Sequence, residues 1–249
     1  MKLSILGATG RIGQLLVKQV LANSEDQLVG CFVSGHSTQL GQLVPGSGLK
    51  YASIEASLDH QADVMVDFST PTGTMHLLDG LAERTNALII GTTGFSEVQI
   101  QRIREAAQHT PIMASVNFAA SFGVFVELCK SVQSAYPRAP AVLEETYHKN
   151  KKASPSGTSL YLAGELEHAR RLAGAPAAMD PIPVQVHRRD AVVGEHVFRL
   201  CLEAEEYKFS FSVNDKESYA SGALEAAHWI LGRPVGLYTQ SDMSGLKKL

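Results

Sequence analysis

The first half of the chain alternates short apolar runs with amphipathic stretches. Runs long enough for a β-strand occupy 2–6, 27–34, 62–69, 87–93 and 111–116. Between them, apolar residues recur at helical spacing after residue 11 and over about 73–84 and 97–109. Ser96 and Gln99 predict a capping box for the last of these helices. Apolar strands that alternate with helices predict an α/β fold, a Rossmann-like doubly wound parallel sheet covered on both faces.

The pattern changes after about residue 117. Helices are predicted near 121–134 and 158–172, and strands at 141–148, 182–188, 196–204 and 207–213. The last three strands follow one another through short turns at Val193–Glu195 and Glu205–Glu206, which predicts a second domain of α+β type with a mixed or antiparallel sheet. An Ala-rich helix over 218–232 precedes the C-terminal tail. We therefore expect domains over 1–116 and 117–224, with a tail over 225–249 that returns to the first domain.

Composition narrows the class of protein. The 249 residues are 45% hydrophobic and carry a formal net charge of −3, so no global basic field recruits nucleic acid. No apolar run approaches the roughly 18 residues that a membrane span needs. The three cysteines are far apart and in no metal-binding spacing, which is typical of reduced thiols. We expect a cytoplasmic protein that binds no metal, membrane or nucleic acid.

A glycine motif, GATGRIG at 7–13, follows the first strand and opens the first helix. Small residues let the backbone approach a pyrophosphate, whose charge is stabilised by free amides at the helix N-terminus. The alternative is a purely structural turn. The strand–turn–helix context favours dinucleotide binding. The candidate residues are Gly7, Ala8, Thr9, Gly10, Arg11, Ile12 and Gly13.

The second strand ends in FVSGHST at 32–38, without the acid that usually binds the ribose hydroxyls of NAD. No Lys or Arg lies between Lys18 and Lys50 to bind a 2′-phosphate directly. Ser34, with His36, Ser37 and Arg11, is a candidate to accommodate that phosphate. The pattern favours NADPH, or use of both NADPH and NADH.

Two further loops follow predicted parallel strands, DFSTPTGT at 67–74 and GTTGF at 91–95. Ligands of open α/β sheets bind at the carboxyl ends of the strands. Each loop alone is equally typical of an ordinary turn, because Gly, Pro, Ser and Thr dominate turns. Together they favour a wall for the nicotinamide.

A basic cluster precedes a predicted helix start in EETYHKNKKASPSGTS at 144–159. His148 and Lys151 lie in the loop, and Ser156, Gly157 and Thr158 form the first turn of the helix. Free amides and hydroxyls at that turn are suited to a carboxylate. The alternative is a solvated basic loop beside a capped helix. Its position opposite a dinucleotide domain favours an anion-binding reaction site.

The motifs together, in this order and spacing, resemble the dihydrodipicolinate reductases (4-hydroxy-tetrahydrodipicolinate reductases) of lysine biosynthesis. They include GATGRIG, DFSTPTGT, GTTGF and HKNKKASPSGT from the segments quoted above, the Asn117–Phe118 step, VVGEH at 192–196 and SYASGALEAAHWI at 218–230. The resemblance implies an N-terminal Rossmann-like domain and a C-terminal domain whose sheet builds a homotetramer. It also implies reduction of a cyclic unsaturated dicarboxylate by NADH or NADPH.

The resemblance assigns roles by position. Residues 7–12 would hold the pyrophosphate. The residues that would line the nicotinamide are Gly91, Thr92, Thr93, Ser115, Val116, Asn117 and Phe118. His148, Gly157 and Thr158 would bind the substrate carboxylate, and Lys151 would donate a proton. Lys216 stands where the family carries a basic residue near the substrate.

The chain departs from the family at the pair of adjacent histidines, which reads Tyr147–His148 here. Tyr147 could donate the proton, although a reference pKa of about 10 suits it less than histidine at about 6.5. Alternatively, Tyr147 points away and His148 takes both roles. Two other functions remain open: a related reductase of another cyclic imine or keto acid, and a nucleotide-binding protein without catalysis.

Overall fold

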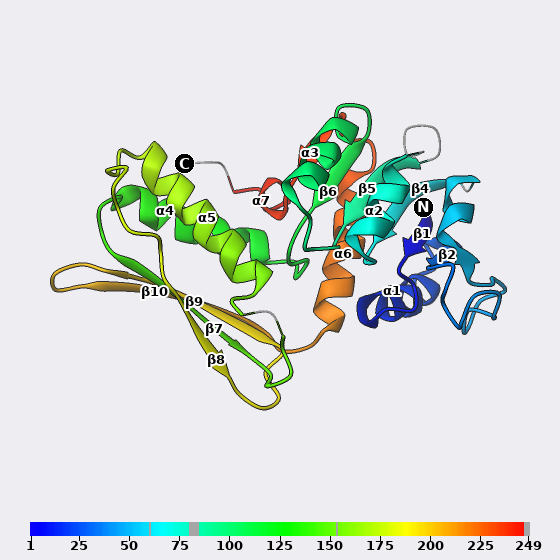
Figure 1. Ribbon diagram of the computed structural model, residues 1–249, viewed down its shortest axis with the longest axis horizontal. Coiled ribbons are helices and arrows are strands. Elements are labelled where there is room, and N and C mark those ends of the chain that lie inside the picture. Colours follow the sequence, from blue (N-terminus) through cyan, green and yellow to red (C-terminus); the bar gives the residue numbers. More distant parts are fainter. Residues whose placement is uncertain (60, 80–84, 153, 247–249) are drawn as a thin grey trace. The chain divides into compact units, whose positions relative to one another are not determined.

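The structure, a computed structural model, describes residues 1–59, 61–79, 85–152 and 154–246. The chain divides into two compact units (Figure 1). The first combines Met1–Ala120 with Glu217–Met243, and the second is built mainly from Ser121–Lys216. Within the described ranges, every helix is too short or too polar to span a lipid bilayer.

A parallel seven-stranded sheet forms the centre of the first unit, in the order β11-β6-β5-β4-β1-β2-β3. Every neighbouring pair runs parallel, which confirms the predicted Rossmann-like sheet. Alternation along the first strand sends Leu3 and Ile5 into one apolar core and Leu6 into a second. The strands are β1 (Lys2–Leu6), β2 (Gln27–Val33), β3 (Ala52–Ser53), β4 (Ala62–Asp67), β5 (Thr85–Ile90), β6 (Pro111–Ala114) and β11 (Gly236–Tyr238).

Helices cover both faces of this sheet. Leu16 of α1 and Ala223 of α6 pack into the core that contains Leu3, while Leu77 of α2 and Ile103 of α3 pack into the other. The helices are α1 (Arg11–Ala22), α2 (Pro71–Leu78), α3 (Glu97–Ala106), α6 (Glu217–Ile230) and α7 (Gln240–Met243), with a 3₁₀ helix η1 (Ile54–Asp59).

The start of α3 is the capping box that the sequence predicts. The Ser96 hydroxyl accepts the Gln99 N–H at 3.4 Å, and the Ser96 N–H donates to the Gln99 side chain at 2.9 Å. Two of the amides that a helix start leaves without intrahelical acceptors are thereby satisfied.

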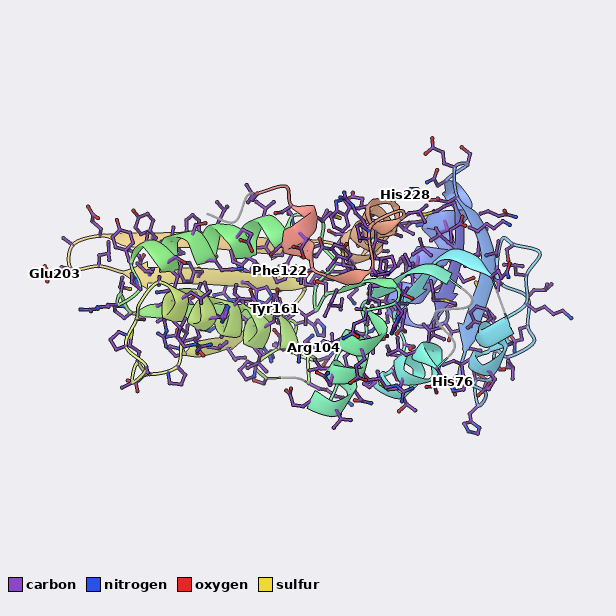
Figure 2. All side chains as sticks on the ribbon, turned by 90° about the horizontal axis from the view of Figure 1, so that it is seen from above. His76, Arg104, Phe122, Tyr161, Glu203 and His228 are labelled. Atoms are coloured by element: carbon purple, nitrogen blue, oxygen red, sulfur yellow. The ribbon has the colours of Figure 1, made fainter. Side chains whose placement is uncertain are left out.

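The second unit is a four-stranded mixed sheet with two helices on one face. The order is β10-β9-β7-β8, with β7 and β8 parallel and the other pairs antiparallel. Phe122 and Tyr161 meet between the two helices, with ring centroids 6.3 Å apart (Figure 2). The elements are α4 (Phe122–Ala135), β7 (Ala141–Tyr147), α5 (Gly157–Leu172), β8 (Val184–Arg188), β9 (Gly194–Cys201) and β10 (Glu206–Val213).

Two details of the second unit differ from the sequence prediction. The predicted turn at Val193–Glu195 is wrong, because Gly194 and Glu195 already belong to β9. In addition, β8 pairs in parallel with β7 instead of with β9. The cause is the connection through α5. Parallel neighbours need a crossover of about a dozen residues or more, and α5 supplies one between β7 and β8.

The first unit also departs from the sequence prediction, at its short elements and at its last helix. β3, η1, β11 and α7 are too short for a periodic signal and were not predicted. The predicted helix over 73–84 ends at Leu78, and residues 80–84 lie outside the described residues. The expected boundary at residue 224 also differs, because α6 belongs to the first unit from Glu217 onward.

The backbone of Phe118 and helix α6 approach each other closely at Gly222. A Cβ added at Gly222 would lie 1.8 Å from the Phe118 carbonyl oxygen. Only a residue without a side chain therefore permits this packing.

We expect Gly222→Ala to lower the melting temperature, because overpacking costs about 1–3 kcal/mol. Gly164→Ala in α5 is the matched control, since a Cβ there meets nothing within 4 Å. Alanine is the better helix former by about 1 kcal/mol, so the control should melt at the same or a higher temperature. Equal melting temperatures for the two variants in calorimetry would contradict this packing.

Candidate active site

The glycine turn between β1 and α1 is held by its own backbone. The N–H groups of Gly7 and Ala8 donate to the Phe32 carbonyl, at 2.9 and 3.2 Å. Gly7 has φ +79°, and a Cβ there would lie 2.4 Å from the Phe68 carbonyl oxygen. A Cβ at Gly13 would lie 2.1 Å from the Gly7 oxygen. The fold itself therefore requires Gly7 and Gly13.

Gly10 differs from the other two glycines of the motif. A Cβ there would lie 3.1 Å from the Gly7 oxygen, a contact that a small shift relieves. Gly10 is also the N-cap of α1, and it brings no side chain to accept the first amides of the helix. Those amides, with the positive end of the helix dipole and no acid in the first turn, suit a pyrophosphate. The residues present therefore fit a dinucleotide.

Ser34 lies in an exposed turn directly after β2. Its hydroxyl accepts the His36 N–H at 3.3 Å, and its carbonyl accepts the Ser37 N–H at 2.9 Å. A residue that the sequence analysis missed approaches this turn: the Glu55 carboxylate lies 3.9 Å from the position of a Cβ at Gly35.

Glu55 reaches the end of β2 because β3 pairs beside β2, with Val33 opposite Ser53. Hydrogen bonds from its own backbone amide and the Ser53 hydroxyl lower the pKa of Glu55. An ionised carboxylate thus stands near the turn where the sequence showed no acid. Glu55 is present in the sequence, but β3 is too short to be recognised as a strand, so its pairing with β2 and the approach of Glu55 to that turn could not be predicted.

Asp67, at the end of β4, is fully buried and joins the two other predicted loops. It accepts hydrogen bonds from the Ser69 N–H, the Ser69 hydroxyl, the Thr74 hydroxyl and the Thr92 hydroxyl, over 2.5–3.1 Å. Burial raises the pKa of Asp67, and these donors partly offset that effect. The Thr92 side chain is therefore directed at Asp67, while Thr93 beside it is exposed. Gly91 lies against the Phe68 ring.

The predicted nicotinamide residues after β6 form a hydrogen-bonded loop. The Ser115 hydroxyl donates to the Asn117 carbonyl at 2.8 Å, and the Asn117 side chain accepts the Ala119 N–H at 2.9 Å. Val116 is half-buried. Phe118 is 1% exposed and lies 5.7 Å from the Phe68 ring, so its side chain belongs to the core. Ser115 and Val116 are the more accessible of the four.

In the second unit, the start of α5 has the geometry of an anion site. Ser156 caps the helix by accepting the Ser159 N–H at 3.2 Å. Gly157 is exposed, and a Cβ there would meet nothing within 4 Å. The amides of Gly157 and Thr158 belong to the first turn, which has no intrahelical acceptors. Gly157 is therefore open to a ligand such as a carboxylate, whereas Thr158 is buried.

The basic loop before α5 separates its lysines. A turn closed by the Lys151 N–H and the His148 carbonyl, at 3.1 Å, folds Lys151 back so that its ammonium lies 4.6 Å from the Tyr147 ring centroid. Lys149 instead pairs with Asp190 at 2.8 Å, with both side chains exposed. Lys152 is exposed and His148 half-buried. Lys216, three residues after β10, is also half-buried.

Tyr147 is buried and begins a chain of polar side chains that the sequence analysis missed. Its hydroxyl lies 3.0 Å from His196 Nε2, and His196 Nδ1 lies 3.1 Å from the Ser159 hydroxyl. Ser159 donates to Glu145 at 2.7 Å. Glu145 also accepts the Ser156 N–H at 2.9 Å and an Arg188 N–H at 3.3 Å.

Burial and hydrogen bonding set the protonation states in this chain. Burial alone would raise the pKa of Glu145, but its donors outweigh burial and lower it. Burial lowers the pKa of His196 to about 4, although Glu145 opposes the effect. Burial raises the pKa of Tyr147, against interactions with the Ser156 and Thr158 hydroxyls. At neutral pH these are a carboxylate, a neutral imidazole and a neutral phenol.

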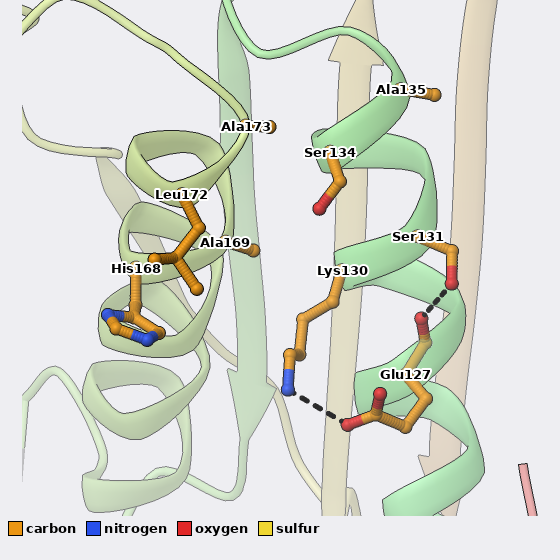
Figure 3. A pocket seen from close by; sticks show the side chains of 9 residues that line it. All are labelled: Glu127, Lys130, Ser131, Ser134, Ala135, His168, Ala169, Leu172 and Ala173. Atoms are coloured by element: carbon orange, nitrogen blue, oxygen red, sulfur yellow. Dashed lines mark hydrogen bonds and ion pairs between the residues drawn. The ribbon is translucent and has the colours of Figure 1, made fainter. Parts of the chain in front are cut away.

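A hollow of about 560 Å³ lies elsewhere in the second unit, between α4 and α5 (Figure 3). Its wall contains Lys130, which already pairs with Glu127 at 3.0 Å and Glu165 at 3.2 Å. None of the predicted site residues is among those that line it. Because its cation is neutralised, this hollow does not suit a dicarboxylate.

Comparison with known proteins gives matches over both units. Residues 1–118 match the family model of the dihydrodipicolinate reductase N-terminus, and residues 122–243 match that of the C-terminus. Proteins called 4-hydroxy-tetrahydrodipicolinate reductase are similar over almost their full length. The one from Burkholderia thailandensis is 30% identical, covering 99% of each chain, and the one from Thermomicrobium roseum is 32% identical, covering 98% and 99%.

A solved structure shares the fold. It is the dipicolinate-bound dihydrodipicolinate reductase from Paenisporosarcina sp. TG-14, with a TM-score of 0.72 at 20% identity. The alignment covers 96% of this chain and 97% of that one. The two family models together span nearly all of the residues, and the full-length relatives carry the name of the same enzyme. The chain belongs to the dihydrodipicolinate reductase family.

Proposed function

We propose that this protein reduces 4-hydroxy-tetrahydrodipicolinate to tetrahydrodipicolinate with NAD(P)H, a step of lysine and diaminopimelate biosynthesis. The observation that carries the proposal is the exposed first turn of α5 at Gly157, preceded in the same segment by a lysine that its turn folds back over the Tyr147 ring. A cyclic dicarboxylate fits this combination of an anion site and an acid. The names of the full-length relatives support the same reaction.

The residues of the chain have separate tasks in this reaction. When bound, a reduced nicotinamide supplies a hydride from its C4. The start of α1 holds the pyrophosphate, and Ser115 and Thr93 border the nicotinamide. Thr158, Gly157 and His148 orient the substrate by a carboxylate. The 4-hydroxyl group of the substrate leaves as water with a hydrogen of the neighbouring carbon, which gives a conjugated C=C–C=N system that can accept the hydride. Lys151 delivers a proton to the carbon next to the one that receives the hydride, and Lys216 adds positive charge to the substrate region.

We also propose a homotetramer that assembles through the sheet of the second unit. The family resemblance implies it, and the two described helices of that unit cover the face that carries Phe198 and Phe211. The opposite face carries ion pairs of Arg199 with Glu144 at 3.2 Å and Glu206 at 2.6 Å. The described helices leave this face of the sheet uncovered, so it is the face through which a second copy would pack.

The glycine turn yields a test of the cofactor site. Gly10→Ala should fold, yet raise the Kd for NADPH about tenfold or more, because the methyl group occupies space beside the pyrophosphate. Gly13→Ala is the contrast: its Cβ would lie 2.1 Å from the Gly7 oxygen, so it should lose thermal stability. Nicotinamide fluorescence and thermal melting measure the two effects. Unchanged NADPH binding by a folded Gly10→Ala variant would refute the assignment.

The proposed reaction is tested by turnover of freshly generated 4-hydroxy-tetrahydrodipicolinate with each cofactor. We expect oxidation of both, with NADPH used at least as well as NADH. Removal of the Glu55 charge should favour a 2′-phosphate further. Glu55→Gln is expected to raise the NADPH/NADH ratio of kcat/KM about threefold, as expected for a screened surface charge.

The control for that ratio is Glu225→Gln, an exposed acid on α6 that should leave the ratio unchanged. Oxidation of neither cofactor would refute the reaction and favour a related substrate or a protein that only binds the nucleotide. An equal change of the NADPH/NADH ratio in both variants would show that Glu55 does not act on the cofactor.

The lysines of the basic loop should not be equivalent. Lys151→Ala should lower kcat about 100-fold or more, within the range of a positioned general acid. Lys149→Ala and Lys152→Ala are matched controls, because both side chains are exposed. They should raise KM less than about threefold, and less still at high salt. If all three variants lose kcat to a similar extent, the loop is only a solvated basic segment.

A further inference from the structure

Four buried side chains of the second unit form one continuous hydrogen-bonded chain, from Glu145 through Ser159 and His196 to Tyr147. The successive distances are 2.7, 3.1 and 3.0 Å. All four residues are at most 5% exposed. Tyr147 is the residue that replaces the first histidine of the family pair. These hydrogen bonds therefore determine which role the tyrosine can have.

Each of these hydrogen bonds has a defined donor and acceptor. The Ser159 hydroxyl has one hydrogen, which it donates to the Glu145 carboxylate, so it accepts from His196 Nδ1. A neutral imidazole protonated at Nδ1 has a lone pair at Nε2. Nε2 therefore accepts the hydrogen of the Tyr147 hydroxyl.

The opposite direction would need a protonated Glu145. In that case Glu145 would donate to Ser159, Ser159 to Nδ1, and Nε2–H to the Tyr147 oxygen. Glu145 is instead held as a carboxylate, because it accepts the Ser156 N–H and an Arg188 N–H in addition to Ser159. Only the first direction is compatible with these contacts.

The Tyr147 proton is therefore directed inward, to His196. If Tyr147 gave this proton to a substrate, Nε2 would have no proton to return. A phenolate would then be left in a buried site that also holds the Glu145 carboxylate. The lone pairs of the phenol oxygen are the part that the chain leaves available, and a lone pair accepts hydrogen bonds but donates none.

The ring of Tyr147 has a second contact that explains its presence. The Lys151 ammonium lies over it, 4.6 Å from the centroid, within the range of a cation–π interaction. The Tyr147 and His196 rings also meet edge to face, with centroids 5.6 Å apart, and this contact helps to fix the plane of the Tyr147 ring. A fixed ring face holds the ammonium in one place.

We propose that Tyr147 is a positioning residue for Lys151 and is not the proton donor, and that Glu145, Ser159 and His196 fix it in that role. The inference rests on the proposed function. The proton comes from Lys151: an N–H bond of the ammonium breaks, a C–H bond of the substrate forms, and the electron pair stays on the lysine nitrogen. That carbon lies next to the one that would receive the hydride from a bound reduced nicotinamide, once the 4-hydroxyl group of the substrate has left as water. Solvent returns a proton to the amine.

Kinetics of two variants test the proposal. Tyr147→Phe keeps the ring face and removes the hydroxyl, so kcat should fall less than about threefold and the alkaline limb of the pH profile should remain. Tyr147→Leu removes the ring, so kcat should fall about tenfold or more with little change in KM. Loss of a general acid costs about 10²–10⁴ in rate. A fall of that size in Tyr147→Phe, with loss of the alkaline limb, overturns the proposal.

The direction of the chain is measured without turnover. Nitrogen NMR of ¹⁵N-histidine-labelled protein at neutral pH distinguishes the two neutral tautomers, and His196→Gln identifies the signal. We expect a proton on Nδ1 and none on Nε2. A proton on Nε2 would overturn the proposal even if the variants do not fold.

The two experiments separate the possible failures. A protein with the expected tautomer but no turnover of the dicarboxylate would contradict the proposed function and leave the hydrogen-bond direction standing. An active protein in which Tyr147→Phe loses the alkaline limb would contradict only the inference. NADPH binding by the first unit and thermal melting serve as folding controls for each variant.

Discussion

A carboxylate without access to water must be surrounded by donors, and Glu145 imposes that requirement on the second unit. It is fully buried, and its donors come from two segments: β8 through Arg188, and the start of α5 through the Ser156 amide and the Ser159 hydroxyl. Meeting this requirement places the start of α5 beside the end of β7. The anion site and the turn that carries Lys151 are consequences of that placement.

Asp67 imposes a similar requirement on the first unit, with a different electrostatic result. Its donors are an amide and three hydroxyls, and burial raises its pKa. Glu145 has the Arg188 guanidinium among its donors, and its pKa is lowered. The neutral donors of Asp67 link the two loops that follow β4 and β5. The donors of Glu145 include the Arg188 guanidinium, which also keeps Glu145 ionised. The Tyr147 hydroxyl donates to His196 only while Glu145 is ionised.

The sequence predicted the elements that repeat and missed those that depend on contacts across the chain. The apolar periods of 2 and 3.6 residues identified the parallel sheet, and Ser96 and Gln99 identified a helix start. β3 has two residues and no period, so the approach of Glu55 to the end of β2 was not visible. Phe118 was assigned to the ligand wall from its motif, but its side chain packs in the core.

The candidate site depends on both local and long-range contacts. Lys151, Gly157 and Thr158 lie near one another in sequence, and local helix and turn rules bring them together. His196 is 49 residues from Tyr147 and 37 from Ser159, so only the pairing of β7 with β9 reveals its contacts. It lies in the VVGEH segment, which carried the family resemblance without a stated role. Residues matched by motif thus acquire a physical role only through strand register.

Acid affects the stability of the second unit and the orientation of its hydrogen bonds through the same groups. The pKa of His196 is about 4 in the fold against 6.5 in an unfolded chain, so the unfolded state binds more protons as pH falls below 6.5. Glu145 has a lowered pKa, so its contribution is also lost as pH falls through that value. Both groups therefore lower the free energy of unfolding of the second unit as the pH falls. Protonation of Glu145 would also reverse the direction of the hydrogen bonds that lead to Tyr147. The ionisation that stabilises the fold is therefore the one that the proposed role of Lys151 as proton donor requires.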